Sequence, residues 1–133
     1  MKSFTKEFTT ICEMLAHIYF NAKVLHWNFT KDYSLHLLFD RISEDCIDAI
    51  DSVAESCILP FEGKVEELDF QITSKESTLE NLKTTIQDLA DMIQKLVKDE
   101  EMSEGAKNTL SGIAEMLNVK AYLISNSTNG NNQ

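Results

Sequence analysis

Proline and glycine are scarce in this chain, with one proline and four glycines among 133 residues. These two residues interrupt helices most often, so their scarcity favours long helices and argues against a fold built from tight turns. Hydrophobic residues make up 43% of the chain and charged residues 26%, a balance typical of globular proteins. A chain of this length forms one domain with a substantial core. We therefore expect a single helical domain.

Positive charge is scarce as well. The 12 lysines and arginines stand against 22 aspartates and glutamates, which gives a formal net charge of -10 and a pI near 4.6. A surface this acidic repels the phosphates of nucleic acids, and the polar C-terminal residues 126–133 include no lysine or arginine. We therefore expect no appreciable binding to duplex DNA.

Long hydrophobic runs are missing, and the first residues do not have the pattern of a secretory signal. The cysteines are an odd number without C-x-x-C spacing, a pattern that supports neither a disulfide framework nor a zinc knuckle. They are Cys12, Cys46 and Cys57. We expect buried free thiols in a cytoplasmic protein that does not associate with a membrane.

Apolar residues recur at every third or fourth position, the spacing of one helix face, in four segments of the chain. In the first segment this stripe consists of Phe8, Ile11, Leu15, Ile18, Ala22 and Leu25. The predicted helices cover about residues 4–29, 35–59, 77–98 and 104–125. Residues 1–125 are thus the predicted domain, and residues 126–133 are predicted to be a polar, disordered tail.

The links between these helices differ in length. The first and third are short, so each makes its two flanking helices antiparallel neighbours. The second, about residues 60–76, is long enough to return along the bundle. Ser77–Glu80 then has a capping-box sequence at the start of the third helix. The predicted fold is an all-α, ferritin-like, up-down-down-up four-helix bundle with a long crossover, and an ordinary antiparallel bundle is the alternative.

The second predicted helix carries metal-ligand side chains on one face. At about 100° per residue, the positions at roughly 0°, 40°, 60° and 100° around its axis are His36, Asp40, Asp51 and Glu55. Two i,i+4 pairs of this kind suit a divalent first-row metal. The pairs lie about 22 Å apart along the helix, so one chain cannot close a site. Two copies packed antiparallel about a two-fold axis would bring the first pair of one chain to the second pair of the other.

His26, near the turn between the first two helices, could complete the half-site of His36 and Asp40. The intrasubunit di-iron site of ferritins needs Glu-x-x-His on two helices, and no histidine of this chain has a glutamate three residues before it. The simplest alternative for the acidic residues is a solvated helix face.

Three motifs occur together at characteristic intervals: LHWNF at residues 25–29, LHLLFD at 35–40 and IDSVAE at 50–55. In these motifs the chain resembles the Dps family of mini-ferritins. The resemblance implies a ferroxidase centre between two subunits, where non-haem iron is bound. Its ligands would be His26, His36 and Asp40 of one subunit with Asp51 and Glu55 of the two-fold mate.

The same resemblance implies an activity and an assembly. Members of this family form hollow dodecamers from two-fold dimers, oxidise Fe(II) with hydrogen peroxide and store ferric iron in the cavity. Trp27 matches the family's tryptophan beside the ferroxidase centre, and an aromatic plug at the end of the bundle is its alternative role. The turn after Trp27 is shorter than in the family and lacks glycine. The alternative function is therefore a noncatalytic ferritin-like shell or interaction protein.

Overall fold

The computed structural model describes residues 2–73 and 77–131. This part of the chain contains no strand, and its four long helices are α1 (Thr5–Asn28), α2 (Tyr33–Val53), α4 (Leu79–Leu96) and α5 (Glu104–Asn131). A π-helical turn, η1 (Ala54–Ile58), and the short helix α3 (Leu59–Glu62) continue α2. The predicted all-α class is therefore confirmed. Within the described residues, no helix combines the length and the apolar character needed to cross a membrane.

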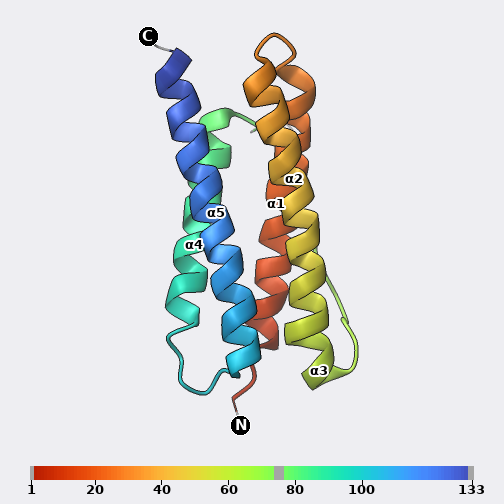
Figure 1. Ribbon diagram of the computed structural model, residues 1–133. Coiled ribbons are helices and arrows are strands. Elements are labelled where there is room, and N and C mark those ends of the chain that lie inside the picture. The colour runs from red at the N-terminus through yellow and green to blue at the C-terminus, as the bar shows by residue number, and fades with distance from the viewer. Residues whose placement is uncertain (1, 74–76, 132–133) are drawn as a thin grey trace.

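The four long helices form a bundle of two antiparallel pairs. α1 packs chiefly against α2, and α4 packs chiefly against α5. In Figure 1, α1 and α5 run upward while α2 and α4 run downward. The helices thus follow the up-down-down-up order that was predicted from the lengths of the links.

The link between α3 and α4 lies along α1 in its described parts. The backbone N–H of Asp69 donates to Oε2 of Glu13 at 2.6 Å. Further along α1, the hydroxyl of Ser77 donates to the side-chain oxygen of Asn21. Residues 74–76 of this link lie outside the described residues, so the complete crossover stays a prediction.

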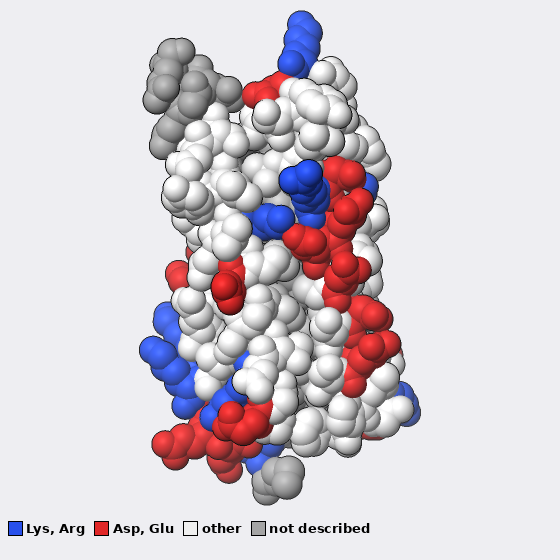
Figure 2. Space-filling view, in the orientation of Figure 1, with Lys and Arg blue, Asp and Glu red and all other residues white. Residues whose placement is uncertain are grey.

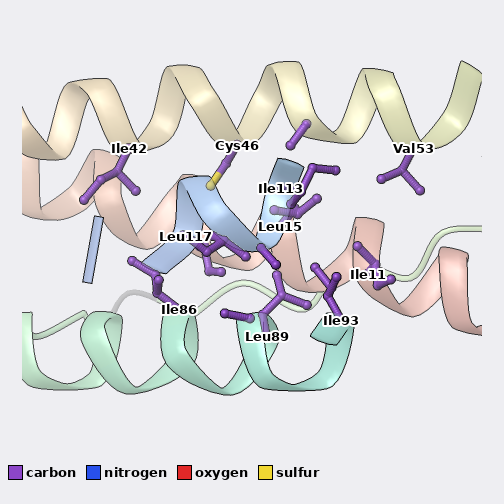
Figure 3. Close-up of a cluster of buried hydrophobic side chains, with 14 of the residues drawn as sticks. Ile11, Leu15, Ile42, Cys46, Val53, Ile86, Leu89, Ile93, Ile113 and Leu117 are labelled. Carbon is purple, nitrogen blue, oxygen red and sulfur yellow. The ribbon is translucent and has the colours of Figure 1, made fainter. Parts of the chain in front are cut away.

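The predicted apolar stripes form one core. Figure 3 shows side chains of all four long helices meeting in the middle of the bundle, among them Leu15, Cys46, Leu89 and Leu117. All four of these side chains are buried. Burying one large apolar side chain stabilises a fold by about 1.5–3 kcal/mol. The burial of these stripes is therefore the main contribution that holds the helices together.

A side-chain cap precedes α2, and another precedes α4. Asp32 precedes α2, and its Oδ1 accepts a hydrogen bond from the backbone N–H of Leu35 at 3.1 Å. For α4, the capping residue is Thr78 and not Ser77, because Oγ1 of Thr78 accepts from the N–H of Asn81 at 3.1 Å. The predicted capping box was therefore one residue out of register. The hydroxyl of Ser77 is used instead in the contact with α1.

The second predicted helix is not a regular α-helix up to residue 59. The N–H of Leu59 donates to the carbonyl of Ala54, which is the i to i+5 bond of a π-helix. Pro60 follows directly. In a regular α-helix its ring would clash with the carbonyl four residues earlier, so the wider turn occurs where proline disturbs the helix. Glu55, one of the predicted ligands, lies in this turn.

The last helix is longer than the spacing of its apolar residues predicted. α5 continues past residue 125 and ends at Asn131. This segment contains no proline, so its backbone hydrogen bonds can continue without interruption. Residues 132–133 of the predicted tail lie outside the described residues.

Candidate metal centre

Two histidines meet where α1 ends and α2 begins. His26 lies in the last turn of α1 and His36 in the first turn of α2. The short turn between these helices brings the two imidazole rings into a stack, with centroids 3.9 Å apart and planes inclined by 22°. The turn thus joins two potential metal ligands that are ten positions apart in the sequence.

The two histidines are held by reciprocal hydrogen bonds. Nδ1 of His26 lies 2.7 Å from the backbone oxygen of His36, and Nδ1 of His36 lies 2.6 Å from the backbone oxygen of His26. A carbonyl oxygen only accepts, so each Nδ1 carries the proton and donates. In a neutral ring this tautomer leaves the lone pair of Nε2 available for a metal ion. The backbone of each histidine therefore orients the ring of the other.

Asp40 adds an oxygen ligand to this pair. Its Oδ1 lies 4.0 Å from Nε2 of His26. Two atoms bonded to one ion at about 2.1 Å each lie at most about 4.2 Å apart, so this separation is within reach of a shared metal. The structure thus stacks His26 on His36 and places Asp40 beside His26, but it does not arrange these three predicted ligands of one half-site as a group that could hold a metal ion.

Lys23 also lies at this half-site, which the sequence did not lead us to predict. Its Nζ lies 2.8 Å from Oδ1 of Asp40, and both side chains are partly exposed. The hydrogen bond from Lys23 holds the pKa of the Asp40 carboxyl below its ordinary value, and the same bond raises the pKa of Lys23. The signal was available in the sequence, because Lys23 precedes His26 by three residues and therefore shares its helix face.

The second half of the predicted site lies far from the first within one chain. Asp51 and Glu55 are exposed, one near the end of α2 and one in η1. They share the helix face of His36 and Asp40, and the two pairs lie about 22 Å apart along the axis. Among the described residues, no group of three or more His, Cys, Asp or Glu side chains is placed to hold a metal ion. The two halves can join only through a second copy of the chain.

Three aromatic residues occur close to the histidines in the sequence. Trp27 is 60% exposed, so it does not plug the end of the bundle. Phe29 is packed there instead, with its ring edge-on to that of Phe39 at a centroid distance of 5.2 Å. Tyr33 is 71% exposed, and its ring lies 6.4 Å from that of His36. Tyr33 therefore lies beside the half-site, and Trp27, next to His26 in the sequence, is exposed.

Carboxylates continue from this half-site along the outer side of α2. We call this row the acidic face of α2, and it consists of Asp40, Glu44, Asp48, Asp51 and Glu55. At about 100° per residue these five positions fall within an arc of about 80°. Figure 2 shows acidic side chains gathered in a band along this side of the molecule. A face of this charge attracts cations.

The arrangement supplies nitrogen and carboxylate oxygen ligands, a set that fits first-row divalent metals. The chain matches no protein-family model, no curated protein and no solved structure, so the interpretation of the site depends on its own geometry.

Proposed function

We propose that this protein is a Dps-like mini-ferritin that oxidises Fe(II) with hydrogen peroxide at sites shared by two subunits and stores the ferric product in a hollow shell. The observation that carries the proposal is the reciprocal hydrogen bonding of His26 and His36, which leaves Nε2 of both rings for a metal ion. Asp40, 4.0 Å from one of these nitrogens, supplies the oxygen ligand of the same half-site.

The ligand set suits iron as a substrate. Imidazole nitrogen and carboxylate oxygen both bind Fe(II), and the anionic oxygens bind Fe(III) more strongly, which favours loss of an electron. In the overall reaction two Fe(II) ions give one electron each to hydrogen peroxide. The O–O bond breaks, and two protons complete two water molecules.

The second half of each site would come from a two-fold mate. In an antiparallel pair of α2 helices centred between residues 45 and 46, position 36 faces position 55 and position 40 faces position 51. The His36 end of one chain then meets Glu55 and Asp51 of the other, and two equivalent sites form per pair. The exposed Trp27 and Tyr33 would be covered by the same contact. A dodecamer built from such dimers is the assembly we propose.

The proposal includes the cytoplasm as the place of action and excludes DNA as a partner. Cys12, Cys46 and Cys57 are free thiols in the structure, which fits a reducing compartment. The net charge of -10 opposes binding to a phosphate backbone.

The test is iron oxidation by wild type and by the double variant Asp51→Asn/Glu55→Gln. Fe(II) and hydrogen peroxide are added to the protein, and the rise of ferric absorbance is followed. We expect the double variant to lose at least about tenfold in rate, because outer-shell changes alone cost that much at metal sites. The control is Glu66→Gln/Glu67→Gln, which removes two exposed carboxylates far from the site in sequence. Equal rates for wild type and the first variant would exclude the ferroxidase activity.

One observation favours the second candidate, a noncatalytic ferritin-like shell or interaction protein. Lys23 already neutralises Asp40 through the 2.8 Å ion pair. A shell that has lost its metal chemistry would form a large particle and oxidise iron no faster than the Asp51→Asn/Glu55→Gln variant. The same measurements, combined with size-exclusion chromatography, therefore separate the two functions.

A further inference from the structure

The outer face of α2 combines carboxylates with large exposed apolar side chains. Tyr33, Leu37 and Ile47 are 71%, 36% and 46% exposed. At about 100° per residue they lie roughly 60°, 100° and 20° from His36, so Tyr33 and Leu37 fall within the arc of the acidic face of α2 and Ile47 lies about 20° outside it. Apolar side chains of this size are usually covered when they cluster on one helix face. The apolar side chains therefore favour contact with another surface, whereas the carboxylates oppose it.

A second copy of the chain fits this face by position. The second copy is reversed about a point between residues 45 and 46. The nitrogen ligands at one end of the first copy then lie over the carboxylates at the other end of the second copy. The reversal also places Ile47 of each copy near the axis, opposite Glu44 of the other. The apolar contacts would lie at Ile47, near the centre, and at Tyr33 and Leu37, beside His36 at each end of the contact.

Charge opposes this pairing when no metal is bound. Each copy contributes the five carboxylates of the acidic face, and among the described residues one cation, Lys23, lies within ion-pair distance of them. Lys120 pairs with Asp45, which lies outside the arc of the acidic face. In the pair, position 40 of one copy faces position 51 of the other, so carboxylate meets carboxylate. Screening by salt does not remove this repulsion, since facing side chains lie closer than the Debye length of about 8 Å.

We infer that a divalent metal ion controls the pairing of two chains through α2, so that metal-free chains associate weakly and metal-loaded chains associate tightly. This inference rests on the proposed function, because the ion must bind His26, His36 and Asp40 of one copy together with Asp51 and Glu55 of the other. An ion held by both copies brings positive charge between facing carboxylates. By linkage, it strengthens pairing by the same factor by which pairing strengthens its own binding.

The test measures particle mass by sedimentation of the full chain at low micromolar concentration. The protein is stripped with a chelator and then compared with and without Zn(II), which is redox-inert and forms no mineral. We expect zinc to raise the association constant about 5–150-fold, the usual range of coupling between linked binding events. The Asp51→Asn/Glu55→Gln variant loses this response. The control Glu66→Gln/Glu67→Gln, with the same change in charge, keeps it.

A second variant tests the charge argument separately. Glu44→Gln/Asp48→Asn removes two carboxylates of the acidic face that are not proposed ligands. We expect its metal-free form to associate more tightly than metal-free wild type. An association constant that is the same with and without zinc overturns the inference, and so does a metal-free Glu44→Gln/Asp48→Asn variant that associates no better than wild type.

The two proposals fail in different ways. Rapid iron oxidation by a particle whose mass does not respond to zinc would exclude metal control of pairing and leave the ferroxidase function standing. Zinc-dependent pairing without iron oxidation would exclude the ferroxidase function and support metal control of pairing.

Discussion

Lys23 of α1 and Asp40 of α2 form an ion pair at the candidate metal centre, with 2.8 Å between Nζ and Oδ1. The same Oδ1 lies 4.0 Å from Nε2 of His26. A metal ion that binds Asp40 must therefore compete with the ammonium group of Lys23. The ion pair keeps the carboxylate charged, and we expect it to lower the affinity of the half-site for metal.

Replacing Lys23 by methionine should strengthen metal binding. The methionine keeps the apolar part of the side chain and removes the competing charge. Partly exposed ion pairs contribute about 0.2–1 kcal/mol, so the affinity for Zn(II) should rise by up to about fivefold. Titration calorimetry measures this change, and Lys31→Met, which removes an exposed lysine in the neighbouring turn, is the control. Unchanged or weaker binding by Lys23→Met would show that the ion pair does not compete with metal.

Replacing His36 by glutamine should weaken both the site and the turn. It removes one nitrogen ligand, and it removes the ring that donates to the carbonyl of His26. We expect the affinity for Zn(II) to fall at least about tenfold. Loss of the hydrogen bond should lower the free energy of unfolding by about 0.5–1.5 kcal/mol, as measured in urea.

The matched control for this variant is His17→Gln. His17 also lies near a backbone oxygen, that of Gln71 at 3.4 Å, but it belongs to the middle of α1. Zinc binding should be unaffected by this change. If both histidine variants lost zinc equally, the assignment of the half-site to His36 would be wrong.

The three cysteines should be chemically inert while the protein is folded. Burial raises the pKa of Cys12 and Cys46 to about 12 and the pKa of Cys57 to about 11. The reactive form of cysteine is the thiolate, which is therefore rare at neutral pH. An aromatic disulfide reagent should label no thiol in the native protein and all three in urea. Rapid labelling of Cys57 alone in the native protein would instead indicate local opening of η1.

The ion pair between Lys2 and Asp99 should make stability depend on pH. Nζ of Lys2 lies 2.6 Å from Oδ2 of Asp99 and ties the start of the chain to the turn before α5. The hydrogen bond from Lys2 lowers the pKa of Asp99 from 3.8, and the same bond raises the pKa of Lys2 from 10.5. The contribution to stability is therefore complete between these two ordinary values. It is lost as the pH falls through the lowered pKa of Asp99, or rises through the raised pKa of Lys2.

The measurement is the urea midpoint of wild type and of Lys2→Met across this pH range. The variant should be less stable at about pH 7, and the difference should shrink toward about pH 2. Because the side chains of Lys2 and Asp99 are at least partly exposed, the difference in urea midpoint should also shrink in high salt. A difference that stayed constant from neutral to acidic pH would show that Lys2 acts through packing and not through Asp99.

The apolar stripes predicted the number of long helices and their approximate limits, and the lengths of the links predicted their antiparallel pairing. This was possible because helical hydrogen bonds are local and a stripe of buried residues repeats with the period of the helix. The same regularity placed His36, Asp40, Asp51 and Glu55 on one face of α2. It also indicated that their two pairs are too far apart to meet within one chain.

Only the tertiary structure showed how these side chains are held. The reciprocal bonds of His26 and His36, and the arrival of Lys23 at Asp40, depend on how α1 and α2 pack against each other. The capping residue of α4 also depends on packing. The hydroxyl of Ser77 donates a hydrogen bond to α1, and Thr78 caps α4 instead. Periodicity describes each helix in isolation, whereas the side-chain partners depend on the packing of residues from different helices.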